Sequence, residues 1–412
     1  MRILIQTVGS AGDVHPFVGI GKALRHRGHD VVLLANEVFA DVAERAGLEF
    51  VESGDAQTFV STNADPDIFD PGKSLRVVIG GMVIPELRDT IASIEARLDR
   101  TDVLVASTLG FASRVVRELH DVPLVIAHLA PNSFRSNHRM AKSDRMWVSD
   151  RSPRWMKRSW WAFVDAYADR AVGPELNAVR AERGLAPVSK FLSQWIYSPD
   201  RTLGLFPDWF GPPQPDWPEN VRLTGFPLYD EGDQRPIDAE LQAWLTDGAP
   251  PVVFTAGSAN VRSEAFFDAV VSVSKALGLR AVLVTRSPDI VASDLPATMR
   301  HEAYVPFGRL LPRSRALVSH GGVGTCAQAL ASGTPHVVAH MAFDQRDNGS
   351  RLEDLGTGRA ISMAKFNGKR AQKALEAVLE DEVVTRAEEL SRLVDRDAAL
   401  DRTCQEIEAM GA

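Results

Sequence analysis

The sequence contains only two cysteines among its 412 residues, Cys326 and Cys404. Two thiols can build neither a disulfide framework nor a zinc site unaided, so we expect both to be reduced and inert. No apolar run approaches the ~20 residues that a membrane-spanning helix needs. The start of the chain reaches polar residues within ten positions, too soon for a secretory signal peptide. We therefore expect a cytoplasmic protein.

The sequence also has fewer basic than acidic residues. The 46 Lys and Arg residues stand against 54 Asp and Glu residues, which gives a formal net charge of −8. Proteins that bind nucleic acids by neutralising phosphates carry the opposite balance. We therefore expect no nucleic-acid partner.

A length of 412 residues exceeds what one hydrophobic core usually supports, so we expect two domains. Strand and helix signals alternate in both halves, which is typical of parallel sheets with helices on both faces. Helices are expected at 15–29 and 38–46, and a polar loop at 53–73. The expected strands are 2–8, 30–35, 48–51, 102–108, 123–129, 251–255, 280–284, 301–305, 316–319 and 336–340.

The middle of the chain interrupts this alternation. Residues 133–197 are rich in Trp and Arg, and residues 207–230 contain six prolines, a composition that favours irregular chain and a domain joint. We expect an N-terminal domain at 1–230 and a second domain at 231–385. A C-terminal helix at 386–412 is expected to pack back on the N-terminal domain.

A loop with two glycines, Gly9-Ser10-Ala11-Gly12-Asp13-Val14-His15-Pro16, follows the first strand. Ligands of open parallel sheets bind beyond the carboxyl ends of the strands. Pro16 suits the first turn of the next helix, and Gly12 permits a tight turn before it. Asp13 either caps that helix or acts as a general base in the crevice. His15 is the rival base, because its pKa is better matched to neutral pH.

Two short motifs end strands of the second half. In Phe254-Thr255-Ala256-Gly257-Ser258, the Ser258 hydroxyl and free backbone N–H groups can hold a phosphate; an ordinary turn is the alternative. In Tyr304-Val305-Pro306, the ring can stack on a nucleobase while the backbone pairs with the edge of the base. A tyrosine of the core is the alternative reading of that tripeptide.

The most informative stretch runs from 320 to 348, H-G-G-V-G-T-C-A-Q-A-L-A-S-G-T-P-H-V-V-A-H-M-A-F-D-Q-R-D-N. His320, Gly321, Gly322, Gly324 and Thr325 fit a turn between a strand and a helix. Backbone N–H groups in such a turn and the positive end of the helix dipole bind anions. The spacing matches neither the dinucleotide fingerprint nor a Walker loop. His320 either donates to a pyrophosphate and stabilises a departing nucleotide diphosphate, or is a satisfied histidine at a strand end.

The same stretch ends in Asp344, Gln345 and Asn348, whose donors and acceptors suit a hydroxyl-rich ligand. A helix cap with a polar first turn is the alternative. Phosphate at one end and a polyol at the other indicate a nucleotide sugar. The helix dipole and His320 can replace a metal ion, so we expect neither a metal nor a cofactor beyond this co-substrate.

Residues 135–170 combine large aromatic and basic side chains. Such a segment can rest on an anionic membrane surface, line a pocket for an acidic amphiphile, or pack its aromatics inward. Its members are Trp147, Trp155, Trp160 and Trp161 with Arg139, Lys142, Arg145, Arg151, Arg154, Lys157 and Arg158.

Together, the G-x-x-G-D-V-x-P start, the H-G-G-x-G-T turn and the D-Q-x-x-N cluster resemble the inverting glycosyltransferases of the two-Rossmann (GT-B) fold. The resemblance covers essentially the whole chain. The start is similar to the sterol and antibiotic branch, which has Asp where plant-type enzymes have a catalytic His. That correspondence falls on Asp13, not on His15.

The joint region resembles the rhamnolipid-forming rhamnosyltransferases more closely. The chain departs from them at Gly321, where they have proline. The shared strings are Leu176-Asn177-Ala178-Val179-Arg180, Gln194-Trp195, Ser198-Pro199, Leu205-Phe206-Pro207, Trp209-Phe210, Pro212-Pro213, Asp216-Trp217-Pro218 and Thr224-Gly225-Phe226-Pro227-Leu228.

The resemblance implies an α/β protein with two Rossmann-like domains that face each other across a cleft. It implies a dTDP- or UDP-sugar donor bound with its base near Tyr304 and Val305, its diphosphate on Ser258, His320 and the glycine turn, and its sugar on Asp344 and Gln345. The favoured reaction is transfer of L-rhamnose from dTDP-rhamnose to a lipid such as a hydroxyalkanoyloxy-alkanoate. With such an acceptor, we expect the protein to contact the inner face of the cell membrane. The alternatives are a glucosyltransferase acting on a sterol, macrolide or phenolic aglycone, and a catalytically silent partner subunit.

Overall fold

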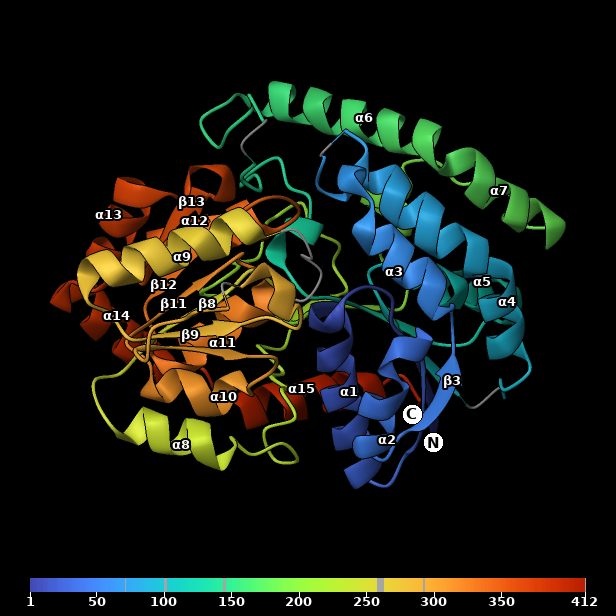
Figure 1. Ribbon diagram of the computed structural model, residues 1–412. Coiled ribbons are helices and arrows are strands. Elements are labelled where there is room, and N and C mark those ends of the chain that lie inside the picture. Colours follow the sequence, from blue (N-terminus) through green and yellow to red (C-terminus); the bar gives the residue numbers. More distant parts are fainter. Residues whose placement is uncertain (71, 100–101, 144–145, 258–262, 292, 412) are drawn as a thin grey trace. The chain divides into compact units, whose positions relative to one another are not determined.

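The computed structural model describes residues 1–70, 72–99, 102–143, 146–257, 263–291 and 293–411 (Figure 1). The chain forms two compact units. The first comprises Met1–Pro227 and Arg396–Ala412, and the second Leu228–Asp395. Each unit is a parallel sheet with helices packed on it, so the predicted α/β class with two Rossmann-like units is confirmed.

The first unit is built on a seven-stranded sheet in the order β3-β2-β1-β4-β5-β6-β7. The strand order reverses between β1 and β4, which is where open α/β sheets bind ligands at the carboxyl ends of their strands. The strands are β1 (Arg2–Gln6), β2 (Asp30–Ala35), β3 (Glu49–Glu52), β4 (Val103–Ser107), β5 (Leu124–His128), β6 (Arg201–Gly204) and β7 (Val221–Leu223).

Helices fill the connections of the first unit. The α-helices are α1 (Ala11–His26), α2 (Ala40–Arg45), α3 (Ala56–Ala64), α4 (Ile84–Glu95), α5 (Phe111–His120), α6 (Arg154–Ala171), α7 (Gly173–Glu182) and α15 (Arg396–Glu408). Shorter or wider helical turns are η1 (Glu37–Phe39), η2 (Pro66–Phe69), η3 (Arg76–Val83), η4 (Pro131–Ser133) and η5 (Phe191–Trp195).

The central strands of this sheet are continuous apolar runs because helices cover both faces. Ile3, Leu4 and Ile5 of β1 are all fully or almost fully buried. Ile3 pairs with Val31 on one side and with Val103 on the other. This central position of β1 sets the loop after it at the switch point of the sheet.

The second unit is built on a six-stranded sheet in the order β10-β9-β8-β11-β12-β13. Its strands are β8 (Val252–Thr255), β9 (Ala281–Val284), β10 (Met299–Glu302), β11 (Ala316–Ser319), β12 (His336–His340) and β13 (Gly358–Ser362). Its helices are α8 (Ala239–Thr246), α9 (Glu264–Leu277), η6 (Pro288–Ile290), α10 (Phe307–Leu310), η7 (Leu311–Arg313), α11 (Val323–Ser332), α12 (Gln345–Leu355), η8 (Met363–Lys365), α13 (Gly368–Val378) and α14 (Asp381–Ser391). The order reverses between β8 and β11, so the glycine turn after β11 lies at this second switch point.

Three expectations from the sequence were wrong in detail. Helix α1 begins at Ala11 rather than at residue 15, because Ser10 serves as its N-cap. Pro16 therefore lies in the second turn, where its missing N–H leaves the Gly12 carbonyl without its usual donor. The expected polar loop at 53–73 contains α3 and η2, and the irregular stretch at 133–197 contains the long helix α6.

The expected C-terminal helix at 386–412 is two helices: α14 ends at Ser391 in the second unit, and α15, from Arg396, belongs to the first unit. Arg27, at the end of α1, donates from Nε to Glu408 Oε1 at 2.8 Å, and His29 approaches the same oxygen at 2.7 Å. Thr403 donates to the Thr224 hydroxyl at 2.8 Å. Among the described residues, no helix is long and apolar enough to cross a membrane.

Candidate functional site

The turn between β1 and α1 is shaped around the carboxylate of Asp13. The backbone N–H of Ser10 donates to Asp13 Oδ2 at 2.8 Å, and the Ser10 hydroxyl donates to the same oxygen at 3.0 Å. Gly9 has φ +130°, and a Cβ built on it would lie 2.4 Å from Asp13 Oδ2. Only glycine fits there, because the carboxylate occupies the space that a side chain would need.

Of the two roles that the sequence left open for Asp13, the structure shows the helix cap, and the general base stays a prediction. The Asp13 carboxylate satisfies the N-cap residue of α1, as a residue at the third helical position does in a capping box. Burial raises the pKa of Asp13 above its ordinary value, and the two hydrogen bonds from Ser10 oppose that rise. A carboxylate with a raised pKa is a stronger base than an ordinary aspartate.

The other two residues predicted in this loop lie in the same helical segment. Gly12 is exposed, and a Cβ on it would meet only the Ser10 hydroxyl, at 3.7 Å. His15 is partly buried two residues beyond Asp13. The structure thus brings Gly12, Asp13 and His15 together at the start of α1.

The turn between β11 and α11 contains two glycines at which a side chain would collide with a neighbour. Gly321 has φ +90°, and a Cβ on it would lie 2.3 Å from Val338 Cγ1. A Cβ on Gly322 would lie 2.7 Å from His320 Nε2. Proline fixes φ near −65°, so a relative with proline at position 321 must form this turn differently.

Gly324 and Thr325 lie in the first turn of α11, which begins at Val323. A Cβ on Gly324 would meet no atom within 4 Å. The backbone N–H groups at this end of the helix have no partner within the helix. The turn therefore presents backbone donors and open space at the positive end of a helix dipole.

The His320 ring lies between two glycines. A Cβ on Gly257 would be 2.7 Å from His320 Cε1, so the preceding strand-to-loop junction reaches this ring through a residue without a side chain. Burial lowers the pKa of His320 from 6.5 to about 4, which keeps the imidazole neutral at neutral pH. Its Nδ1 is buried and has no hydrogen-bond partner among the described residues. A neutral ring carries one N–H, which is available to a ligand.

Behind the turn lies a pair of residues that the sequence interpretation missed. The Ser319 hydroxyl lies 2.8 Å from His336 Nε2 and accepts the Gly321 N–H at 3.0 Å. His336 is 1% exposed, and burial lowers its pKa to about 3. Nothing in the sequence distinguishes this histidine from any other at the start of an apolar strand.

The Asp344 to Asn348 cluster is tied to the same turn. Asn348 is fully buried, and its amide donates to Asp344 Oδ2 at 2.7 Å and to the Gly321 carbonyl at 3.0 Å. Gln345 Oε1 accepts the backbone N–H groups of Met341 and Ala342, at 2.7 and 3.1 Å. Asn348 thus positions Asp344 against the glycine turn, which joins the two ends of the stretch 320–348.

Tyr304 is held by the segment that begins the second unit. Its hydroxyl donates to the Asp230 carbonyl at 2.6 Å, and the Arg235 guanidinium lies 4.3 Å from its ring centre. Only the ring face away from Arg235 is therefore available to stack on a base. Val305 and Pro306 are buried beside it, and Val305 belongs to a core cluster. Nothing in the sequence indicates that Arg235 lies against this tyrosine.

Two residues named in the sequence interpretation, Ser258 and Arg145, lie outside the described residues. Among the described residues, no group of three or more His, Cys, Asp or Glu side chains is arranged to hold a metal ion.

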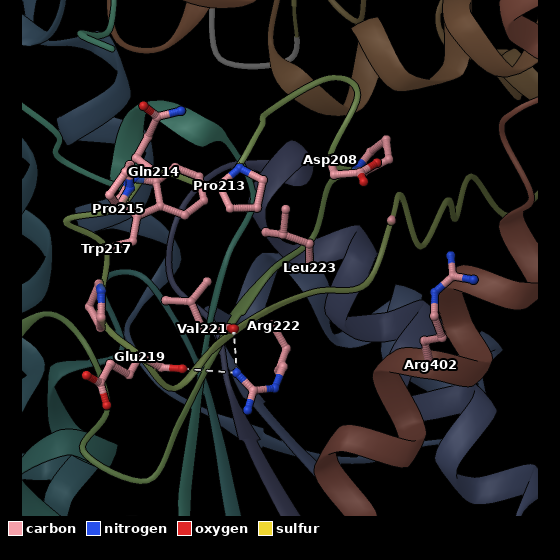
Figure 2. Close-up of a pocket in the computed structure, with 13 residues that line it drawn as sticks. Asp208, Pro213, Gln214, Pro215, Trp217, Glu219, Val221, Arg222, Leu223 and Arg402 are labelled. Atoms are coloured by element: carbon pink, nitrogen blue, oxygen red, sulfur yellow. Dashed lines mark hydrogen bonds between the residues drawn. The ribbon is translucent and has the colours of Figure 1, made fainter. Parts of the chain in front are cut away.

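A cavity of about 630 Å³ lies in the first unit, at the edge of its sheet (Figure 2). It is lined by the proline-rich segment around Trp217, by β7 and by Arg402 of α15. Arg222 folds back to donate to the carbonyls of Glu219 and Val221, at 3.0 and 2.9 Å. None of the site residues predicted from the sequence lines this cavity.

Comparison with known proteins identifies both halves of the chain. Residues 3–136 match the glycosyltransferase family 28 N-terminal domain, and residues 279–410 match the C-terminal domain of erythromycin biosynthesis protein CIII-like proteins. The chain is 30% identical to O-mycaminosyltylonolide 6-deoxyallosyltransferase of Streptomyces fradiae, over 99% of this chain and 97% of that protein.

Solved structures show the same fold. The glycosyltransferase of kitacinnamycin superposes with a TM-score of 0.76 at 22% identity, covering 100% of this chain and 99% of that one. The glycosyltransferase VinC, solved in complex with dTDP, superposes with a TM-score of 0.69 at 19% identity, covering 100% and 99%. The two parallel-sheet units are therefore those of the GT-B fold. The chain belongs to the glycosyltransferases that combine a family 28 N-terminal domain with an erythromycin biosynthesis protein CIII-like C-terminal domain, and it is a glycosyltransferase.

Proposed function

We propose that the protein transfers a 6-deoxyhexose, with L-rhamnose from dTDP-rhamnose the favoured case, to a hydroxyl group of a hydrophobic acceptor. The observation that carries the donor half is the glycine turn at the start of α11. It offers backbone donors, the neutral His320 ring and an open space at Gly324. The dTDP complex of VinC and the 6-deoxyallosyltransferase relative support a dTDP-linked deoxy sugar.

In this proposal the diphosphate lies on the glycine turn, on the N–H groups of residues 322–325, because the Gly321 N–H already donates to Ser319. The sugar hydroxyls lie on Asp344 and Gln345. Asp13 takes the proton of the acceptor hydroxyl. The acceptor oxygen attacks the anomeric carbon from the side opposite the diphosphate, the bond to the diphosphate oxygen breaks, and the configuration inverts. The helix dipole of α11 and the His320 N–H stabilise the charge of the departing nucleotide diphosphate, so the reaction needs no metal ion.

The acceptor is proposed from the joint region, whose sequence resembles enzymes that glycosylate a hydroxyalkanoyloxy-alkanoate lipid. A large aglycone is the second candidate, and the relative that acts on O-mycaminosyltylonolide favours it. Both acceptors are hydrophobic and present a hydroxyl group to the base. A lipid acceptor would bring the enzyme to a membrane surface.

The test is a matrix of donors and acceptors, with release of nucleotide diphosphate as the readout. dTDP-rhamnose, another dTDP-6-deoxyhexose and UDP-glucose are each combined with a hydroxy-fatty-acid dimer, a macrolide aglycone and a sterol. We expect the highest kcat/KM with a dTDP-6-deoxyhexose, and unchanged turnover in excess EDTA. Preference for UDP-glucose with the sterol would overturn the proposal. Nucleotide binding without turnover for any pair would overturn it as well.

A further inference from the structure

Helix α6 is firmly anchored on its inner side. Lys157 is buried and donates from Nζ to the carbonyls of His138 and Asp150, at 2.8 and 2.9 Å. Asp165 is buried as well and pairs with Arg135, while the Ser193 hydroxyl donates to its other oxygen at 2.7 Å. The inner polar groups are therefore satisfied within the first unit.

The outer side of α6 is unlike an ordinary solvated helix face. Trp155 is 68% exposed, Phe163 63% and Tyr167 37%, and the Tyr167 hydroxyl donates to the Gly72 carbonyl. These three residues are spaced so that they share one side of the helix, over about 18 Å of its length. The exposed Trp147 extends this surface, since its ring packs edge-on against Trp160, which in turn packs against Phe163.

The charges on this outer side all have one sign. Its charged side chains are Arg154, Arg158 and Arg170, all exposed, and the Arg154 guanidinium lies 3.3 Å from His138 Nδ1 at the start of the helix. The two acidic residues of α6 are directed elsewhere: Asp165 is buried, and Asp169 accepts the backbone N–H groups of Lys190 and Phe191. Neither Arg158 nor Arg170 forms an ion pair with another described residue. A face of three arginines is thus set in a chain of net charge −8.

We infer that this surface, defined by Arg154, Trp155, Arg158, Phe163, Tyr167 and Arg170 and called the α6 face, docks on an anionic lipid bilayer. Tryptophan and tyrosine rings partition into the headgroup region, and arginines next to them are attracted to anionic lipids. The charge pattern favours a lipid surface over a second copy of the chain. Two α6 faces paired about a twofold axis would oppose arginines to arginines, with no acidic side chain between them.

This inference deepens the proposed function, because a lipid acceptor would be reached at such a surface. It does not depend on turnover, however. Docking through the α6 face is a property of the first unit alone, and it can be measured without donor or acceptor.

The test is flotation of the full-length protein with vesicles of phosphatidylcholine alone or of phosphatidylcholine and phosphatidylglycerol in equal parts. We expect at least tenfold more protein on the anionic vesicles, and release in high salt. Arg154→Gln/Arg158→Gln/Arg170→Gln should reduce anionic-vesicle binding at least tenfold. Trp155→Ser/Phe163→Ser should also reduce binding to anionic vesicles, even at low salt where charge attraction is strongest, because the aromatic anchors are lost.

Matched controls separate the α6 face from general charge and stickiness. Lys369→Gln/Arg370→Gln/Lys373→Gln removes three exposed positive charges from α13, and Leu393→Ser removes an exposed apolar side chain from the second unit. Both should bind vesicles as the unaltered protein does. Circular dichroism checks that all variants are folded.

Equal binding to neutral and anionic vesicles, no binding, or equal losses in the α6 and α13 variants would overturn the inference. The inference would also be overturned if the protein bound no vesicles and light scattering showed a dimer that Trp155→Ser/Phe163→Ser dissociates. Nucleotide diphosphate release with a water-soluble acceptor should be the same in the α6 variants and the unaltered protein. The vesicle result is therefore valid even if no glycosyl transfer is found, and the transfer result is valid even if the protein binds no vesicles.

Discussion

The carboxylate of Asp13 accepts two hydrogen bonds from Ser10, one from the backbone N–H and one from the hydroxyl, and both end on Oδ2. The same side chain thus fixes the start of α1 and leaves Oδ1 as the oxygen that can take a proton. This arrangement requires glycine at position 9, because any side chain there would collide with the carboxylate. A helix cap and a general base are compatible roles for one aspartate.

Asp13→Asn is expected to separate these roles. An asparagine Oδ1 can accept the same bonds from Ser10, so the helix start and donor binding should persist. Without a base, the rate of nucleotide diphosphate release should fall about 10²–10⁴-fold. Steady-state kinetics and calorimetric titration with nucleotide diphosphate measure the two effects.

Asp13→Ala is the matched control for the cap. It should lose activity as well, and in addition lower the free energy of unfolding by about 1 kcal/mol, because the cap is lost. If Asp13→Asn keeps its turnover, the base is His15, and His15→Asn should then be the inactive variant.

Gly324→Ala tests whether the turn before α11 holds a ligand. The added Cβ would meet no protein atom within 4 Å, so the fold should tolerate it. Alanine also favours a helix over glycine, so the free energy of unfolding should stay level or rise by up to about 1 kcal/mol. If the diphosphate lies on this turn, the methyl group should weaken nucleotide binding at least tenfold, as measured by calorimetry.

Gly321→Ala provides the contrast, because its Cβ would lie 2.3 Å from Val338 Cγ1 in a backbone conformation with φ +90°. That variant should be destabilised by about 1–3 kcal/mol. If Gly324→Ala binds nucleotide with unchanged affinity, the diphosphate does not lie on the turn before α11.

His320→Ala is expected to raise the Kd for the donor about 10- to 100-fold and to slow transfer, since a hydrogen bond to a charged group is lost. His320→Asn retains an N–H donor near the same place and should recover part of both. Because the pKa of His320 is about 4, turnover should not change between pH 6 and 8 through titration of this ring. If His320→Ala has the same kinetics as the unaltered protein, His320 takes no part in donor binding or transfer.

The sequence predicted the fold and much of the site because both depend on local patterns. Strands 316–319 and 336–340 were predicted residue for residue, since buried parallel strands are uninterrupted apolar runs. Strand β13 was not predicted, because Gly358, Arg359 and Ser362 make an edge strand that lacks this pattern. Residues His336, Arg235 and Ser319 acquire their significance from neighbours that are distant in sequence, and no spacing rule reveals such contacts.

The same limit applies to Asn348. As part of D-Q-x-x-N it was interpreted as a contact for the donor. Asn348 is completely buried, and its two bonds, to Asp344 and to the Gly321 carbonyl, tie the Asp344–Asn348 cluster to the glycine turn, while its contact with the donor stays a prediction. Whether Asp344 and Gln345 hold the sugar remains a prediction.

Three buried histidines predict how stability depends on pH. Burial lowers the pKa of His128 and His336 from 6.5 to about 3 and that of His320 to about 4. Above pH 6.5 these rings are neutral in both the folded and the unfolded chain, so they do not affect the pH dependence. Below it the unfolded chain binds protons that the folded chain does not, so stability falls as the pH drops from about 6.5 toward 4. Each histidine contributes a slope of up to about 1.4 kcal/mol per pH unit.

Urea denaturation between pH 7.5 and 4.5 measures this dependence. His336→Asn is destabilised at every pH, because the bond with Ser319 is altered, but the slope of its unfolding free energy against pH should be shallower by the contribution of one proton. The exposed His26 supplies the control, since His26→Asn should leave the slope unchanged. A slope for His336→Asn equal to that of the unaltered protein would mean that this imidazole is already able to take up a proton in the folded state.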